Sequence, residues 1–224
     1  MTKFRNSKIE EAHEYFKEVV YQAANMEDKG ITYADTVNTI EFLEEAKKTL
    51  SHEKIEIING LRKAYEYVIE KANSKTEITY KDAMNINKLI DSYEKSSAGL
   101  WRIGNVKISK SNWTPPLLTE EQSIEFFDDV KNINSFEEGV EFCAQMSKKQ
   151  LFPNGNKRTA LCFSNLILID KDIDFIQINN RIEYTNKLID FYDDEDKINN
   201  FIEEVKKQTQ NGEYALDVEK EKNR

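Results

Sequence analysis

The sequence predicts an all-α fold, a helical bundle, and three observations support this prediction. Only seven glycines and three prolines occur among 224 residues, so long stretches contain neither helix breaker. Within these stretches apolar residues recur every three or four positions, the spacing of one face of a helix. Two stretches open with a capping box, in which a hydroxyl residue is followed three positions later by Gln or Glu: Thr119 with Gln122, and Ser135 with Glu138.

These signals place the helices in order along the chain. Apolar spacing predicts the first four helices and the last two, and the two capping boxes mark the starts of the fifth and sixth helices. The sixth carries Phe136, Val140 and Cys143 on one face, so we expect burial there. Pro153 and Gly155 then interrupt the chain, and a new helix starts around residues 156–158. The expected ranges are 6–25, 36–50, 52–73, 82–96, 119–132, 135–149, 156–169, 181–193 and 196–208.

Residues 97–116, SAGLWRIGNVKISKSNWTPP, interrupt the helical pattern. Two glycines, the alternating β-formers Val106 and Ile108, and a closing Pro-Pro pair predict a short β-hairpin or extended flap. On these residues alone, a plain surface connection is the favoured interpretation. A connection of this length in a helical domain nevertheless suggests a functional role.

The composition narrows the classes of partner. The chain has 32 Lys+Arg against 41 Asp+Glu, a formal net charge of −9, which disfavours general binding to nucleic acid or an anionic membrane. The longest apolar run is too short to span a bilayer, and the charged N-terminus has no signal-peptide pattern. Cys143 and Cys162 are interpreted as reduced core residues. We therefore expect a cytoplasmic protein.

The stretch QLFPNGNKRT, residues 150–159, is the strongest candidate site in the sequence. Lys157 and Arg158 follow a Gly-Asn turn at the expected start of a helix, where backbone N–H groups lack partners. Unpaired N–H groups, the positive end of the helix dipole and two cations together indicate an anion site, and phosphate is the usual occupant. Solvated or surface-paired cations are the alternative interpretation. The stretch is not a P-loop, because GxxxxGK[ST] is absent.

Other chemistry-bearing residues give weaker signals. His13 and His52 lie on expected helices away from this stretch, and we interpret both as ordinary helix residues. The sequence contains no HExxH, CxxC, EF-hand or GxSxG pattern, so metal-dependent hydrolysis and serine hydrolysis have no support.

The motif QLFPNGNKRTAL resembles the signature HxFx[DE]GNxRxxR of the Fic/Doc (Fido) family, without gaps. The segment 97–116 looks like the target-docking flap of that family, and RIEYTNKLIDFYDDED, residues 181–196, looks like the helix that borders the nucleotide base. The resemblance covers residues 36–205. It implies a helical extension over 1–35, a Fido domain over 36–210 with flap 97–116 and active-site loop 150–158, and a flexible tail over 211–224.

Proteins of this family typically transfer AMP from ATP to a hydroxyl of a target protein, and the Doc branch transfers phosphate. By resemblance, ATP or another nucleotide is the ligand here, and a protein target docks on the flap. A homodimer is a further expectation. The resemblance assigns nucleotide binding to Phe152, Gly155, Asn156, Lys157, Arg158 and Tyr184. It assigns target docking to Trp101, Arg102, Ile103, Val106, Lys107 and Ile108.

Three positions depart from the family signature. Gln150 stands where the family has its catalytic histidine, and an amide cannot accept a proton near neutral pH. General-base catalysis contributes roughly 10²–10⁴ in rate, so this change alone predicts a large loss. Asn154 stands where the family has its magnesium carboxylate. Whether Mg²⁺ binds therefore stays open, and no residue is named as a metal ligand. Leu161 replaces the last arginine, as in the Doc-like branch.

Many Fic proteins carry an inhibitory helix with a pattern like [ST]xxxE[GN]. The nearest match is TVNTIEF within residues 36–50, which makes Glu41 the candidate inhibitory residue, in reach of Arg158. An ordinary helix glutamate is the alternative.

Two classes of function follow. The first is a Fic/Doc-type transferase with altered or weak activity, in which Gln150, Asn154 and Arg158 occupy the catalytic positions. The alternative is a catalytically inactive Fido domain that acts as a nucleotide- or protein-binding regulatory module. A purely structural helical protein ranks below both, because it leaves the cations at the helix start unexplained.

Overall fold

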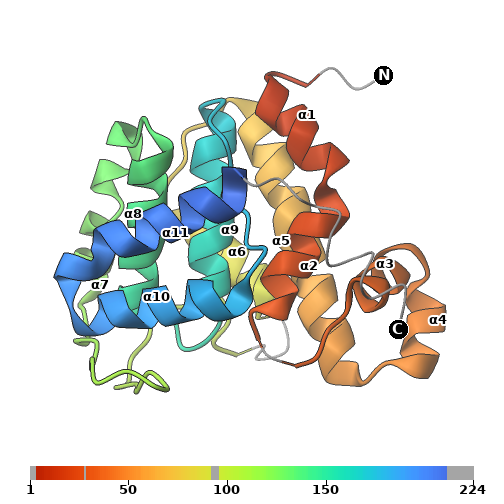
Figure 1. The fold of residues 1–224 in the computed structure, drawn as a ribbon, viewed down its shortest axis with the longest axis horizontal. Helices are drawn as coiled ribbons and strands as arrows, with labels where there is room; N and C mark the ends of the chain where they lie inside the picture. Colours follow the sequence, from red (N-terminus) through yellow and green to blue (C-terminus); the bar gives the residue numbers. More distant parts are fainter. Residues whose placement is uncertain (1–3, 28, 92–95, 211–224) are drawn as a thin grey trace.

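The computed structural model describes residues 4–27, 29–91 and 96–210, and every regular element within those ranges is helical (Figure 1). The α-helices are α1 Ser7–Glu14, α2 Phe16–Asn25, α3 Tyr33–Glu41, α4 Leu43–Thr49, α5 His52–Ser74, α6 Tyr80–Ile90, α7 Glu120–Glu125, α8 Phe136–Lys149, α9 Asn156–Asp170, α10 Arg181–Asp193 and α11 Ile198–Gln210. Two 3₁₀ turns, η1 Asp128–Asn132 and η2 Glu195–Lys197, complete them. The predicted all-α class is confirmed.

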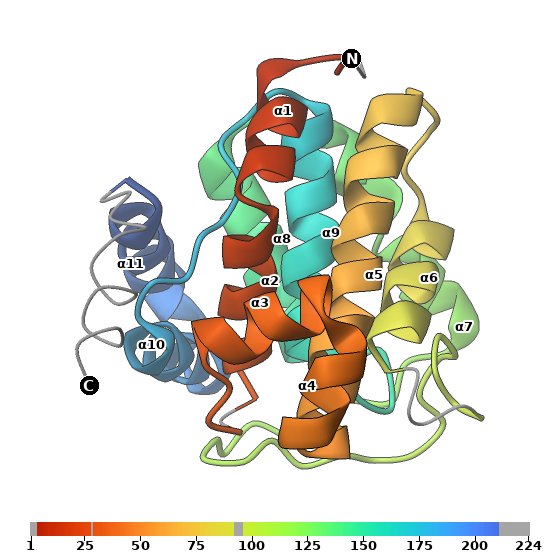
Figure 2. The ribbon, with the colours of Figure 1, turned by 90° about the vertical axis from the view of Figure 1, so that its right-hand side faces the viewer.

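Helix α9 forms the centre of the bundle. Thirteen of its residues are buried, on every side of the helix, which is the pattern of a fully enclosed element. It packs against α8, α5 and α6, and α1 and α2 also contact it. In Figure 2 α9 lies between α5 and the α1–α2 pair, and α10 and α11 lie off to one side. The start of α9, which carries the candidate site, is therefore fixed by the core of the molecule.

Two helices that the sequence predicts as continuous are each broken in two. The stretch 6–25 breaks at Tyr15, whose backbone leaves helical geometry at φ −91° and ψ 24°. The stretch 36–50 breaks at Phe42, with φ −134° and ψ 54°, while a capping box of Thr32 and Asp35 starts α3 earlier than expected. These breaks were missed because neither site carries Gly or Pro. The bend at Phe42 lets α3 cover α2 and α5 while α4 turns back onto α5.

The expected β-hairpin is not present in residues 97–116, which form turns and extended backbone without a strand ladder. The base of this flap is instead held by Arg102. Its backbone N–H donates to the carbonyl of Leu151, and its guanidinium donates to the carbonyls of Gly104, Pro116 and Gln150. Because one side chain holds both ends of the flap, Val106 and Ile108 need no paired strand to keep the loop in place.

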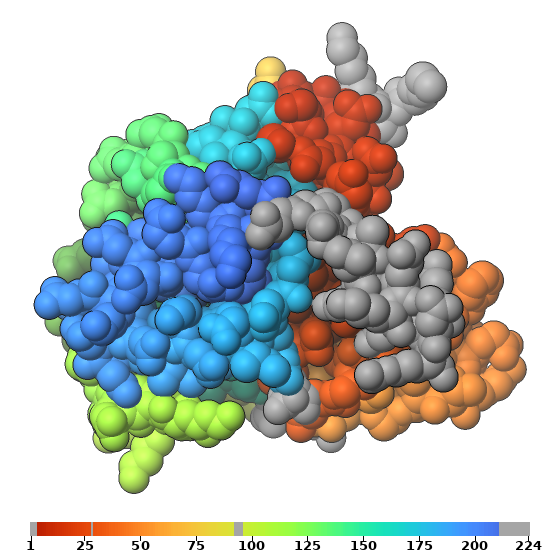
Figure 3. Space-filling view, viewed as in Figure 1, coloured from red at the N-terminus to blue at the C-terminus, as the bar shows by residue number. Residues whose placement is uncertain are grey.

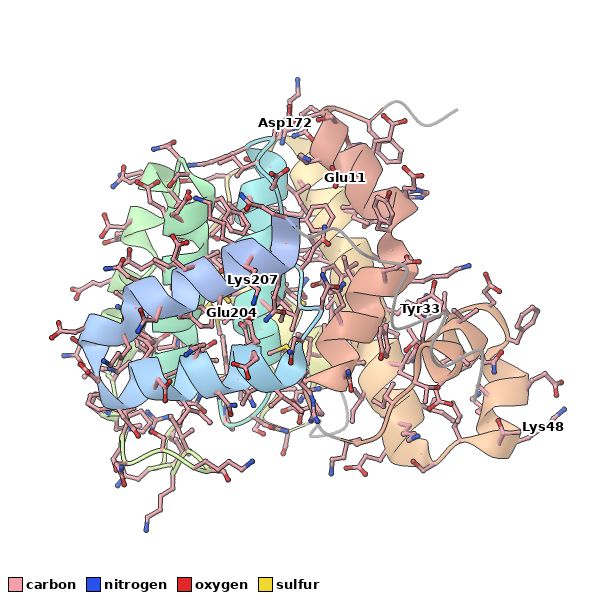
Figure 4. The ribbon with its side chains drawn as sticks, viewed as in Figure 1. Glu11, Tyr33, Lys48, Asp172, Glu204 and Lys207 are labelled. Atoms are coloured by element: carbon pink, nitrogen blue, oxygen red, sulfur yellow. The ribbon has the colours of Figure 1, made fainter. Side chains whose placement is uncertain are left out.

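The first two helices contribute to the same core as the rest of the bundle. Ile9, Val19 and Val20 belong to the buried apolar cluster that includes α5 and α9. Arg5 donates hydrogen bonds to the carbonyl of Ala72 in α5 and contacts Asp170 at the end of α9. Asp172, labelled in Figure 4 beside the start of α1, accepts hydrogen bonds from Ser7 and from the backbone N–H of Lys8. Residues 4–27 are thus packed into the bundle.

Two expectations lie outside the described residues: the end of the helix predicted over 82–96, and the flexible tail over 211–224. The described part of the first of these, α6, ends at Ile90 with Asp91 as its C-cap. Among the described helices, none combines the length and the apolar character that a membrane span requires.

Candidate anion and nucleotide site

The loop between α8 and α9 has a backbone that few sequences can adopt. Gln150 ends α8 with φ 49°, in the left-handed region. Gly155 precedes α9 with φ 72°, a conformation that side-chain-bearing residues adopt only with strain. Two reversals within six residues turn the loop so that the first N–H groups of α9 point out of the bundle core. The Gly-Asn turn predicted from the sequence is therefore present.

The loop is braced from within by Asn156. Its side-chain oxygen accepts from the backbone N–H of Phe152, and its amide nitrogen donates to the carbonyl of the same residue, at 2.9 and 2.8 Å. Phe152 is fully buried and stacks on Trp101, with ring centroids 5.3 Å apart. Phe152 thus anchors the loop, and Asn156, expected to contact phosphate, has its side chain committed to the loop itself.

Gln150, in the position of the family histidine, also has both ends of its side chain in use. Its amide nitrogen donates to the carbonyl of Ser147 at 2.7 Å, and its amide oxygen accepts from the amide of Asn156 at 3.2 Å. Its own carbonyl accepts from Arg102 at 2.7 Å. Gln150 therefore stabilises the loop, and no lone pair of its amide is available as a base at neutral pH.

Asn154, in the position of the family magnesium carboxylate, is likewise bonded within the protein. Its amide nitrogen donates to Asp91 at 3.0 Å, and its amide oxygen accepts from the N–H of Gly155 at 2.8 Å. Asn87 donates to the carbonyl of Asn154 and to the hydroxyl of Thr159, which ties the loop to α6. No cluster of three or more His, Cys, Asp or Glu side chains in the described ranges has metal-binding geometry. The side chains around Asn154 therefore do not fit Mg²⁺.

Arg158 is almost fully buried, with 4% of its surface exposed, and its partner comes from the N-terminal helices. Its Nε lies 2.7 Å from a carboxylate oxygen of Glu27, just past the end of α2. The N–H is not aligned with that oxygen, and no other hydrogen-bond acceptor for Nε occurs in the described part of the chain. The contact is therefore an ion pair whose charge attraction exceeds its directional fit.

The expected contact of Glu41 with Arg158 is not formed. Glu41, at the end of α3, pairs with Lys17 of α2 at the molecular surface. The break at Phe42 turns α3 away from the loop, whereas α2 ends beside the start of α9. The carboxylate that reaches Arg158 is Glu27, which the sequence analysis did not single out because its surroundings match no motif.

A cavity of about 500 Å³ opens over the start of α9, and we call it the anion pocket. Four cations line it, namely Lys107 and Lys110 of the flap, Lys157 of α9 and Arg181 of α10, together with the single carboxylate of Glu27. The remaining lining residues are Met26, Ile108, Ser109, Gln150, Ile182, Thr185, Asn186, Leu188, Ile189 and Tyr192. The pocket thus joins a strongly positive end to an apolar wall on α10.

The charge of Lys157 is affected by this setting. Burial lowers the pKa of its amine, and the positive charges of Arg158, Arg181 and Lys110 lower it further, while Glu27 opposes them. A cationic amine held in a positive field has a favourable partner only when an anion enters. The electrostatics of the pocket therefore favour a negatively charged ligand.

A second cavity, of about 830 Å³, lies on the other side of the Glu27–Arg158 pair. Ser51, His52 and Glu53 at the start of α5 line it, as do Asp91 and Asn154. Glu27 borders both cavities, so this one carboxylate forms part of the partition between them.

The flap residues divide into two groups. Trp101 is partly buried in the aromatic core and Arg102 is 6% exposed, so neither presents a docking surface. Ile103 is 93% exposed, and Lys107 is exposed beside the anion pocket. Val106 and Ile108 are half-buried. Figure 3 shows the yellow-green flap at the lower edge of the molecule, below the blue α10.

Tyr184 does not border the pocket as expected. It is fully buried, packs on Phe201 and lies 3.7 Å from the sulfur of Cys143. The helical period of α10 explains the difference, because Arg181, Thr185 and Ile189 face the pocket while Tyr184 faces the core. Arg181 of this helix was not predicted as a pocket residue. Its positive charge, at the start of a segment expected to border a nucleotide, could have indicated this position.

Comparison with known proteins gives matches at the level of structure alone. No family model matches the sequence, and no curated protein matches it. The structure of Fic-1 from C. elegans superposes with a TM-score of 0.74 at 18% identity over 93% of this chain and 64% of that one. A Fic-domain-containing signaling protein from Bacteroides thetaiotaomicron superposes with a TM-score of 0.74 at 16% identity, over 90% and 85%.

A Fic family protein from Desulfovibrio desulfuricans superposes with a TM-score of 0.60 at 16% identity, over 94% of this chain and 74% of that one. This chain spans less than two thirds of the C. elegans structure. At identities below 25% these likenesses concern the fold alone. The chain has the fold of a Fic domain.

Proposed function

We propose that this protein binds the phosphate groups of a nucleotide in the anion pocket, and that Glu27 competes with the nucleotide for Arg158. The observation that carries the proposal is the charge of the pocket, where four cations and the start of α9 face a single carboxylate. Unpaired N–H groups and the positive end of a helix dipole add to the attraction for phosphate. The apolar wall of Ile108, Ile182 and Ile189 suits the flat face of a base.

Glu27 supplies the control in this proposal. Its carboxylate neutralises Arg158 in the unliganded protein, so a phosphate must displace it before Arg158 can bind. The free energy of breaking this pair is subtracted from the free energy of nucleotide binding. In this proposal the position of Glu27, just past the end of α2, sets the affinity for nucleotide.

The bonding of Gln150 favours a regulatory binding module over a fast transferase. A target hydroxyl needs a base, and both polar ends of Gln150 are used inside the loop. A transferase of altered chemistry is the second candidate, because the flap brings Lys107, Ser109 and Lys110 along the pocket, where a target segment would meet the phosphates.

Binding is tested by titration calorimetry with ATP, ADP and inorganic phosphate. Lys157→Gln and Arg181→Gln should each weaken ATP binding about tenfold, close to 1.4 kcal/mol, the range of one charged hydrogen bond. Lys88→Gln on the exposed side of α6 is the charge-matched control and should leave affinity unchanged. If the unaltered protein and the three variants bind ATP with equal affinity, ATP binds outside the anion pocket or does not bind.

Transfer is tested separately with ATP labelled at the α- or γ-phosphate and a cell lysate. The unaltered protein should bind ATP, but it should label lysate proteins more slowly than the Gln150→His variant does. Fast labelling by the unaltered protein, lost in Arg181→Gln, would reject the module and establish the second candidate.

A further inference from the structure

Lys157 is a cation of the anion pocket whose amine has no partner among the described residues. Arg158 pairs with Glu27, whereas Nζ of Lys157 has neither a hydrogen bond nor an ion pair within the described residues. The side chain is partly exposed and lines a cavity of about 500 Å³, so a small molecule from solvent can reach the amine.

Each element packed around Lys157 presents a charge to it. Arg158 of the same helix, Arg181 of α10 and Lys110 of the flap are positive, and Glu27 after α2 is the one negative group. Burial and these three cations act in the same direction and lower the pKa of the amine. A lysine beside other cations and partly removed from water is an activated nucleophile, because a larger fraction of it is neutral near neutral pH.

The same cations would hold the phosphate of an approaching reagent. Arg181 and Lys110 lie with Lys157 in one pocket, so an anion bound to them sits next to the free amine. The ligand class that uses both features carries a phosphate and an electrophilic carbon.

We propose that Lys157 is a modification site, whose amine is acylated by small acyl phosphates that bind through their phosphate to the neighbouring cations of the anion pocket. The lone pair of Nζ attacks the acyl carbon and the N–C bond forms. The bond from that carbon to the phosphate oxygen breaks, and inorganic phosphate leaves with the electron pair. The surplus proton on nitrogen passes to water, which leaves a neutral amide on Lys157.

Acylation has a direct consequence for the pocket. It removes one of four positive charges and adds bulk within a cavity of about 500 Å³, so anions bind more weakly afterwards. The modification would make nucleotide binding sensitive to the supply of acyl phosphate. The modification does not require that the pocket bind a nucleotide.

The experiment treats the full chain with isotope-labelled acetyl phosphate near neutral pH and measures the acetylation rate of each lysine by peptide mass spectrometry. Lys63 of α5 and Lys88 of α6 are exposed and serve as internal references. Because a lowered pKa raises the neutral fraction of an amine, we expect Lys157 to react several-fold faster than either reference. Saturating inorganic phosphate should remove the excess rate.

Arg181→Gln separates the two parts of the proposal, and its melting curve verifies that it folds. The variant should lower the rate at Lys157 and leave Lys63 and Lys88 unchanged. With p-nitrophenyl acetate, an uncharged reagent, Lys157 should still react faster than the references, but phosphate should protect it less. A rate at Lys157 no higher than at the references with acetyl phosphate would overturn the proposal.

Calorimetry with ATP on the same preparation distinguishes this inference from the proposed function. Fast acylation without ATP binding would reject the nucleotide proposal and keep the modification site. ATP binding with an unreactive Lys157 would reject the modification site alone.

Discussion

At the scale of single residues, the Glu27–Arg158 pair has the greatest effect on the candidate site. Arg158 is 4% exposed, and among the described residues the carboxylate of Glu27, from outside the loop, is the acid that pairs with it. Removing one partner of a buried pair leaves an uncompensated charge, which costs more than the pair itself contributes.

We expect Glu27→Gln to lower the free energy of unfolding by about 1–3 kcal/mol, since Glu27 itself remains part-exposed. Phosphate or ATP should then stabilise the variant more than the unaltered protein, because Arg158 has no competing partner. Thermal melts with and without ATP measure both effects. Glu141→Gln on the exposed face of α8 is the control, and an ATP-induced shift no larger in Glu27→Gln would contradict the competition.

The lowered pKa of Lys157 predicts a pH dependence of anion binding. The folded-state pKa lies below the ordinary lysine value, so the amine is charged below that pKa and neutral above it. Affinity for phosphate should therefore fall as pH rises through the folded pKa of Lys157, at a lower pH than for a solvent-exposed lysine. Calorimetry across this range measures the fall. In Lys157→Arg the same fall should be absent, and a decline that persists unchanged would assign it to another group.

At the scale of elements, the far end of the flap is held by the last turn of α10. One oxygen of Asp193 accepts from the hydroxyl of Ser111 and from the backbone N–H groups of Asn112 and Trp113, at 2.5, 2.9 and 3.1 Å. Lys148 adds a cation–π contact, with its Nζ 4.5 Å from the centre of the Trp113 ring. The flap is thus attached at its base by Arg102 and through residues 111–113 by Asp193.

The pKa of Asp193 is lowered by the hydroxyl of Ser111 and the two backbone N–H groups. A carboxylate with a lowered folded pKa stabilises the fold above its unfolded pKa and loses this effect as pH falls through the folded pKa. The protection of amides in residues 108–113 against hydrogen exchange, taken relative to the intrinsic rate at the same pH, should therefore fall in Asp193→Ala and, for the unaltered protein, in acid. Asp190→Ala, one turn earlier and exposed, is the control. Unchanged exchange in Asp193→Ala would show that Lys148 and Trp113 hold the flap without it.

The contact between α8 and α9 is the tightest in the core. A Cβ on Gly139 would lie 2.6 Å from the Cδ2 atom of the buried Leu168. Alanine is the better helix former by about 1 kcal/mol, so propensity and packing predict opposite effects. We expect packing to win, with Gly139→Ala less stable by about 1–3 kcal/mol in denaturant unfolding. Gly104→Ala, where a Cβ meets open space, should change little; a stabilised Gly139→Ala would show that Leu168 moves aside.

The sequence predicted those parts of the site that depend on local backbone chemistry. The turn at Gly155, the cations at the start of α9 and the anchoring Phe152 follow from residue types that have few alternatives. It could not predict Glu27, Arg181 and Asp91 as neighbours of the loop, since these come together only through the packing of α2, α10 and α6 on α9. It predicted helices correctly but missed breaks at Tyr15 and Phe42, which tertiary packing imposes without Gly or Pro.

At the scale of the whole molecule, the N-terminal helices contact both ends of α9. Arg5 and Asn6 hydrogen-bond to the carbonyls of Ile169 and Asp170 at its C-terminal end, and Glu27 pairs with Arg158 in its first turn. Ile9 and Val19 share the buried core with α5 and α9. The division into an extension over 1–35 and a Fido domain over 36–210 stays a prediction.

This arrangement has a consequence for the newly synthesised chain. Arg5 and Asp170 are 165 positions apart, so α1 and α2 leave the ribosome long before the helix on which they dock. At 5–20 residues per second, the delay is about 10–30 s. During that interval α1 and α2 can pack on α5, but the surfaces that contact α9 lack their partner. The Glu27–Arg158 pair can likewise form only after the first turn of α9 has been synthesised.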